Sequence, residues 1–178
     1  MFTDVSPDFR WNKQDLQTIK KILPHEGTPE AIKLFSRYAY RLSDYGYWFL
    51  LSTLWVSYTG FSDLEEWKRL FSSPRANRET SIMKPSELET FRAFGKYYEH
   101  LTLYRAHRPE EGDWISYSLL VEKAGEFARR RGVDKVTEYK IAMSDVLCFF
   151  LRRGEFEVLI LDKTKVELIR EIPVVVSS

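Results

Sequence analysis

The sequence predicts an α+β fold, in which a helical N-terminal half over residues 1–100 precedes a mixed half over residues 101–178 with a β core. Two observations lead to this prediction. Apolar side chains recur at helical spacing through the first hundred residues, whereas short segments of alternating apolar and polar residues follow His100. A length of 178 residues suits one domain or a small domain with an extension, so the two halves are compatible with one compact domain.

Four helices are expected in the first half. A Thr-Pro step is typical of a helix start, and two Ser-x-x-Glu steps have the spacing of a capping box. The longest apolar stretch, YWFLLSTLWV, is too short to span a bilayer and predicts a buried helix. The expected helices cover residues 28–42, 47–58, 62–71 and 86–99, with Gly60 ending the second and a loop over residues 72–79.

Strands dominate the second half. The segments LTLYRA, WISYS and VTEYKIAM have the alternation of strands, and RRGEFEVLILD and VELIREIPVVV are expected to be two strands of one sheet. An amphipathic helix over residues 119–132 is stopped by Gly132, with basic residues in its last turn. Ser144 and Asp145 are expected to cap a short helix that continues to about Leu151.

Composition excludes several classes of function. With 27 Lys and Arg against 26 Asp and Glu, the formal net charge of +1 gives no general attraction to nucleic acid or to an acidic membrane. The N-terminus lacks the apolar core of a targeting signal, and a single cysteine, Cys148, points to a reducing cytoplasm. The three histidines have no ligand spacing, so no metal site is expected. The many aromatic residues of the first half recur at helical spacing, which favours a packed core over base stacking.

Polar residues stand on three of the expected strands, in the order Arg105, Ser116 and Ser118, and then Glu155 and Glu157. Because side chains two apart in a strand share a face, the two carboxylates are expected to lie on one side although they repel each other. Each feature alone has an ordinary explanation: an arginine that snorkels, a serine that caps the next helix, or a charge that protects a sheet edge. Only the ordered set favours a functional site.

This order resembles the R-S-E class of mono-ADP-ribosyltransferases, in which an arginine, an S-x-S strand and an E-x-E pair form one NAD-binding cleft. LTLYRA looks like the family's first strand, ISYSLLVEKAGEFA like its serine strand with the helix that follows, and EYKIAMSDVLCFFLRRGEFEVLI like the connector and E-x-E strand of phage and bacterial members. The resemblance covers residues 101–161, about a third of the chain. It implies NAD as a co-substrate and an ADP-ribosyltransferase-like β core.

The resemblance also implies roles for individual residues. Glu157 would stabilise positive charge on the ribose and Glu155 would activate an acceptor arginine, while the hydroxyl of Ser116 would hold Glu157 in place. Arg105 would contact the pyrophosphate of NAD. Further candidate NAD-binding residues are Tyr104 beside this arginine, Tyr117 and Phe127 as ring partners, and Ser118.

The expected function is therefore NAD-dependent mono-ADP-ribosylation of a protein target, with arginine as the favoured acceptor, in the cytoplasm, or in the host cytoplasm if the chain is phage-encoded. Phage members of such families often act on host or defence proteins, and the helical region is a candidate for target recognition. The sequence departs from the family at Ala106, where glycine is frequent, and at Tyr117, where Thr or Trp is usual. These departures keep open a non-catalytic protein that inhibits a partner by occlusion. Two further alternatives are an NAD glycohydrolase and a helical interaction module with an incidental sheet.

Overall fold

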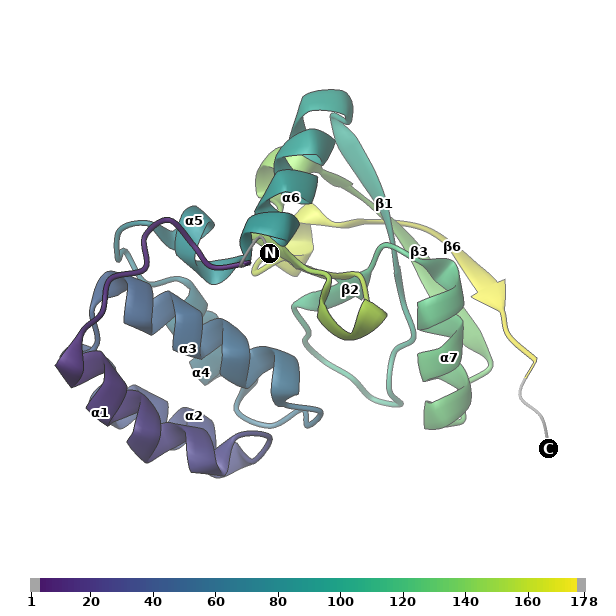
Figure 1. Cartoon of the computed structure of the whole chain (residues 1–178). Coiled ribbons are helices and arrows are strands. Elements are labelled where there is room, and N and C mark those ends of the chain that lie inside the picture. The colour runs from purple at the N-terminus through teal and green to yellow at the C-terminus, as the bar shows by residue number, and fades with distance from the viewer. Residues whose placement is uncertain (1–3, 176–178) are drawn as a thin grey trace. The chain divides into compact units, whose positions relative to one another are not determined.

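A computed structural model of the chain describes residues 4–175, which form two compact units that divide between Leu88 and Glu89. Figure 1 shows the elements of both units in order along the chain. The division falls inside α6 (Pro85–Tyr97), ahead of the boundary near residue 100 that the change of sequence pattern suggests. The α+β class predicted from the sequence is confirmed, with helices in the first unit and a sheet in the second.

The first unit is helical. Its elements are α1 (Lys13–Ile22), the 3-10 helix η1 (Leu23–His25), α2 (Pro29–Tyr38), the 3-10 helix η2 (Ala39–Arg41), α3 (Asp44–Ser57), α4 (Leu64–Phe71), α5 (Arg78–Ile82) and the start of α6. The most apolar helix, α3, packs against α1, α2 and α5. Burial of Trp48, Leu50, Leu51 and Leu54 on α3 supplies the centre of this core.

The four helices expected in this unit are confirmed, with differences at their ends. Helix α3 ends at Ser57 because Tyr58 is already extended, two residues before Gly60. Helix α4 begins after Asp63, which has a left-handed backbone, and not with a cap from Ser62. Helix α6 begins at Pro85, one residue before the expected cap. The expected loop over residues 72–79 runs into α5 at Arg78.

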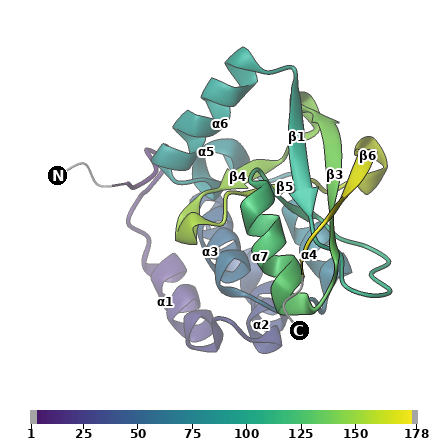
Figure 2. The same cartoon turned by 90° about the vertical axis from the view of Figure 1, so that its right-hand side faces the viewer.

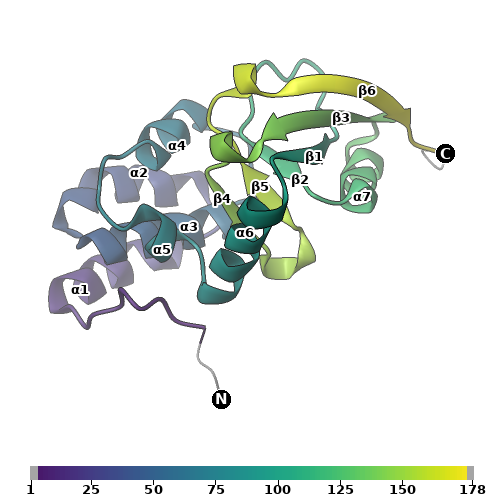
Figure 3. The ribbon, with the colours of Figure 1, turned by 90° about the horizontal axis from the view of Figure 1, so that it is seen from above.

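The second unit contains one six-stranded antiparallel sheet. Its strands, in the spatial order β4-β5-β2-β1-β3-β6, are β1 (His100–Arg105), β2 (Ser116–Ser118), β3 (Lys135–Ala142), β4 (Cys148–Phe150), β5 (Glu157–Leu159) and β6 (Glu167–Pro173). Figure 3 shows β6, β3, β1 and β2 side by side. The two C-terminal strands expected in one sheet are confirmed, although the last residue of the expected segment, Val176, lies outside the described residues.

Helices cover this sheet through specific side chains. Helix α7 (Val121–Arg131) packs against β1, β2 and β3 (Figure 2), and its Ala124 and Ala128 meet Ala106 and Val136. As expected, Gly132 ends the helix with a left-handed backbone at φ 65°. From α6, Phe91 and Phe94 meet Phe149 of β4 edge-to-face, with ring centroids 5.2 and 5.3 Å away.

Two local predictions are wrong. Residues 144–151 are not a helix, because a 3-10 turn, η3 (Met143–Asp145), leads directly into β4, whose three residues are all buried. Glu155 is not in a strand, because β5 begins only at Glu157, after η4 (Arg152–Gly154). Glu155 and Glu157 therefore do not share one face of a strand. Among residues 4–175, no helix has both the length and the apolar character needed to cross a membrane.

Candidate functional site

Arg105, Ser116 and Glu157 meet on three neighbouring strands. Strand β2 lies between β1 and β5, and Ser118 pairs with Tyr104 on one side and with Glu157 on the other. The Ser116 hydroxyl donates to Oε1 of Glu157 at 2.5 Å, and the Ser116 carbonyl accepts from an Nη of Arg105 at 2.6 Å. The residues that define the expected site are therefore in contact, with Ser116 as the link.

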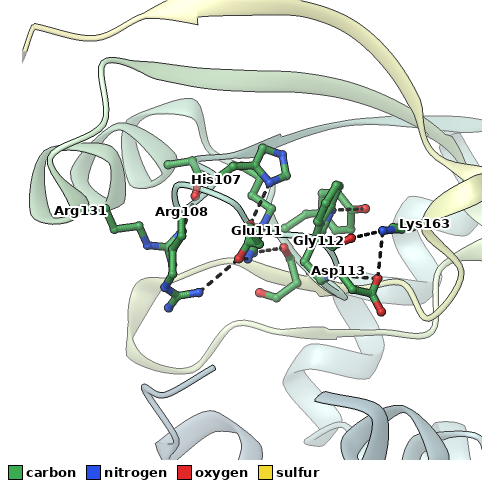
Figure 4. A network of polar contacts seen from close by, with 12 residues as sticks. His107, Arg108, Glu111, Gly112, Asp113, Arg131 and Lys163 are labelled. Carbon is green, nitrogen blue, oxygen red and sulfur yellow. Dashed lines mark hydrogen bonds and ion pairs between the residues drawn. The ribbon is translucent and has the colours of Figure 1, made fainter. Parts of the chain in front are cut away.

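Glu111, in the loop between β1 and β2, is the partner of Arg105 that the sequence did not reveal. Arg105 donates from Nε at 3.0 Å to one carboxylate oxygen and from its second Nη at 2.5 Å to the other. The same carboxylate lies 2.8 Å from Nδ1 of His107 and 3.2 Å from Arg108 (Figure 4). Bidentate pairing of this kind is among the strongest polar contacts in proteins.

The charge state of Glu111 follows from these neighbours. Burial of the carboxyl by itself would raise its pKa, since only 9% of the side chain is exposed. Hydrogen bonds from His107 and Arg105, together with the charge of Arg105, outweigh burial and lower the pKa of Glu111 to about 2. Glu111 is therefore ionised at neutral pH and fixes the guanidinium of Arg105.

Lys163, which follows β5, contacts the other end of the loop that carries Glu111. The Lys163 ammonium donates to the carbonyl of Gly112, lies 3.5 Å from a carboxylate oxygen of Asp113 (Figure 4), and stands 4.8 Å from the ring centroid of Trp114. The indole of Trp114 also contacts His107, at 4.3 Å between ring centroids. These contacts hold the loop beside the start of β2.

Glu155 lies in a strained turn just before β5. Arg153 has φ 61°, Gly154 has φ 66° and Phe156 has φ 50°, a left-handed backbone that costs energy for the two residues with side chains. Strand β2 and the residue after it hold the turn: the Ser118 hydroxyl bonds to the Glu155 carbonyl at 3.3 Å, and the Leu119 amide donates to the Phe156 carbonyl at 2.9 Å. Such strain is found at functional sites more often than elsewhere.

The other expected NAD-binding residues pack within the sheet unit. Tyr117 is only 3% exposed, and burial raises the pKa of its hydroxyl. It accepts a hydrogen bond from Trp114 and packs edge-on against Tyr139. Tyr104 and Phe127 pack against the small cluster between α7 and the sheet. The Ser118 hydroxyl bonds to the backbone of Leu120, at the start of α7.

The arrangement holds the Glu157 carboxylate by the Ser116 hydroxyl, and Arg105 holds the carbonyl of the same serine. It contains no built metal centre: among residues 4–175, no three His, Cys, Asp or Glu side chains come together in a way that suits a metal ion. Comparisons of the chain with protein-family models, curated proteins and solved structures found no match.

Proposed function

We propose that this chain is an NAD-dependent mono-ADP-ribosyltransferase that modifies a protein, with arginine as the favoured acceptor. The observation that supports the proposal most is the double contact of Ser116, which bonds to Glu157 through its hydroxyl and to Arg105 through its carbonyl. Ser116 and Glu157 are 41 positions apart in the chain, and the antiparallel pairing of β2 with β5 brings them together.

The chemistry requires a fixed carboxylate near the ribose of NAD. The bond between ribose C1′ and nicotinamide breaks, and nicotinamide leaves with the bonding pair as a neutral molecule. The sugar then carries positive charge, as in glycoside hydrolysis, and Glu157 stabilises it. An acceptor nitrogen forms the new bond to C1′ and loses a proton. The hydrogen bond from Ser116 keeps Glu157 in one orientation throughout.

Glu155 is proposed to act on the acceptor. Its turn, and not a shared strand face, sets its position relative to Glu157. A carboxylate at this point can hold an arginine guanidinium by a bidentate contact and direct its nitrogen toward the sugar. The strain of the turn is consistent with a backbone kept in place for this purpose.

The test uses NAD labelled in its ADP-ribose part, purified protein and a bacterial lysate. Glu157→Gln should lower nicotinamide release by about 100-fold or more. Glu155→Gln should abolish transfer to protein while slow hydrolysis of NAD continues. Glu167→Gln, on the exposed strand β6, removes the same charge and should leave both activities unchanged.

Other outcomes would identify the alternatives. Nicotinamide release without a labelled protein, unaffected by Glu155→Gln, would show an NAD glycohydrolase. Binding of NAD without turnover would favour a protein that acts by occlusion. If the unchanged chain neither binds nor cleaves NAD, the proposal is refuted, and the helical unit becomes the place to look for function.

A further inference from the structure

His107, which follows the end of β1 by two residues, uses both of its ring nitrogens. Nδ1 stands 2.8 Å from a carboxylate oxygen of Glu111 (Figure 4), and Nε2 stands 2.6 Å from the hydroxyl of Tyr139 on β3. The ring lies edge-to-face with Trp114 and with Tyr139, at 4.3 and 5.9 Å between ring centroids. Only 23% of the side chain is exposed, so hydrogen bonds and aromatic packing together fix the orientation of the ring.

The two partners of His107 decide which ring nitrogen carries the proton. Glu111 is ionised, because its pKa lies at about 2, and its oxygens can therefore only accept hydrogen bonds. Nδ1 is then the donor, and Nε2 of the uncharged ring is the acceptor. On the other side, the oxygen of Tyr139 accepts from the side chain of Thr137, and the hydrogen of Tyr139 can point at Nε2. An exposed histidine ordinarily carries its proton on Nε2, so these contacts select the less common form of the ring.

His107 and Arg105 meet on the same oxygen of Glu111. Oε2 accepts from Nε of Arg105 at 3.0 Å and from Nδ1 of His107, while Oε1 accepts from an Nη of Arg105 at 2.5 Å. A bidentate contact of this kind requires the planes of carboxylate and guanidinium to be aligned. By holding Oε2 from a second direction, His107 keeps the carboxylate in this plane. The other Nη of Arg105 is then directed at the carbonyl of Ser116, at 2.6 Å.

We propose that His107, with its proton on Nδ1, is a positioning residue that holds Glu157 in place from a distance. His107 orients Glu111, and Glu111 orients Arg105. Arg105 holds the carbonyl of Ser116, whose hydroxyl donates to Glu157. The inference rests on the proposed function, to which it adds a residue that touches neither Glu157 nor NAD. Such outer partners are often needed to keep a reactive group in its working geometry.

The first experiment determines the tautomer of His107 by two-bond ¹H–¹⁵N correlation spectra, with ¹⁵N-labelled histidine at about pH 8, where histidine is ordinarily uncharged. Loss of a signal in His107→Asn assigns His107. His25 and His100 are exposed and serve as internal references, with the proton expected on Nε2. His107 should carry its proton on Nδ1, and a proton on Nε2 would overturn the inference.

The second experiment measures steady-state release of nicotinamide by two variants of His107. His107→Asn places its amide near the position of Nδ1 and can still donate to Glu111, whereas His107→Gln places its amide near Nε2, toward Tyr139. We expect kcat to fall by about tenfold in His107→Gln and by no more than about threefold in His107→Asn, with KM nearly unchanged in both. Both variants lose the packing of the ring, so a purely structural role would affect them alike.

His100→Gln, at an exposed position on β1, is the matched control and should change neither kcat nor KM. Thermal melting of each variant checks that the sheet unit is folded. A readout that needs no turnover is the carboxyl ¹³C signal of Glu157, assigned by its loss in Glu157→Gln. This signal should move in His107→Gln and stay in place in His107→Asn.

The two proposals can fail separately. If NAD is never cleaved but the Glu157 signal moves in His107→Gln alone, the transferase proposal fails and the positioning of Glu157 by His107 stands. If NAD is cleaved but His107→Gln and His107→Asn have the same kcat, the transferase proposal stands and the positioning role is overturned. The positioning role is also overturned if the Glu157 signal stays in place in His107→Gln.

Discussion

The ion pair of Glu111 should make the sheet unit sensitive to acid. The pKa of Glu111 lies at about 2 in the folded chain against an ordinary value of 4.5, and this difference corresponds to about 3 kcal/mol of stability at neutral pH. Because the pKa is lowered on folding, the contribution is complete above pH 4.5 and is lost as the pH falls toward 2. The carboxylate is only 9% exposed, so solvent screens the pair weakly.

The perturbation is Glu111→Gln, which keeps the shape of the side chain and removes its charge. At pH 7 the free energy of unfolding should fall by about 3 kcal/mol or more, because Arg105 is also left without its counter-ion. The difference between variant and unchanged chain should shrink between pH 4.5 and pH 2, since a protonated glutamate resembles glutamine. Urea denaturation at pH 7, 5, 4 and 3, followed by circular dichroism, measures the loss of unfolding free energy at pH 7 and its change with pH.

Glu110→Gln is the matched control, because the neighbouring Glu110 is exposed, and it should change stability by less than about 0.5 kcal/mol. Hydrogen exchange in β1 and β2 at pH 7 would locate the loss in the sheet unit. If Glu111→Gln lowers the free energy of unfolding at pH 7 no more than Glu110→Gln does, the ion pair of Glu111 does not stabilise the sheet unit. A cost that stays constant down to pH 3 would also refute this stabilisation, since the effect would then not come from ionisation.

Four further outcomes are expected. Gly46→Ala should destabilise the helical unit by about 2 kcal/mol in thermal melting, because its Cβ would lie 2.5 Å from an oxygen of Asp15. The Cβ added by Gly154→Ala would meet no atom within 4 Å. The variant should still lower the free energy of unfolding in urea by about 1–2 kcal/mol, because Gly154 has a φ of 66°. Phe149→Ala should lower the free energy of unfolding by about 3–5 kcal/mol, since the ring is fully buried. Ser116→Ala should lower nicotinamide release by about tenfold, with little change in melting temperature, because only its hydrogen bond to Glu157 is lost.

Elements with strong local patterns could be predicted from the sequence. Helix α7 combines helical spacing of small and apolar residues with a terminal glycine, and the structure confirms both the helix and its end at Gly132. Strands β1 and β3 have clear alternation, and the structure shows one of the two sets of side chains in each of them buried. In these segments the local preference agrees with the tertiary environment.

The two wrong secondary-structure predictions concern segments in which the local sequence pattern does not decide the structure that the tertiary environment favours. In VLCFFL, a continuous apolar run fits a buried strand as well as a buried helix, and only the pairing of β4 with β5 decides between them. In RRGEFEVLIL, the run of strand formers that begins at Phe156 suggests a strand that opens with Glu155. Three residues with positive φ turn the chain there, and two of them, Arg153 and Phe156, are types that rarely adopt this conformation.

The centre of the site was predictable, whereas its surroundings were not. The resemblance to the R-S-E class implied that Arg105, Ser116 and Glu157 meet, and the structure places Ser116 in contact with the other two. Glu111 was missed because its contact with Arg105 depends on the path of an irregular loop, which no periodicity describes. In the sequence, Arg131 fits the pattern of a basic residue in the last turn of a helix, and its closeness to Arg108 arises only after α7 packs on the sheet.

The strand order explains how Glu111 and Arg105 are connected to the two glutamates of the proposed reaction. Ser116 is on β2, the middle strand of three. Its backbone carbonyl accepts a hydrogen bond from Arg105 of β1, and its hydroxyl donates one to Glu157 of β5. The arginine that Glu111 fixes is therefore linked to Glu157 through Ser116. On the other side, Leu119, just after β2, holds the carbonyl of Phe156 and with it the turn that carries Glu155. Since the short β2 makes both connections, a shift of this strand would move both glutamates together. The ion pair with Glu111 is then best understood as part of the site and not only of the fold.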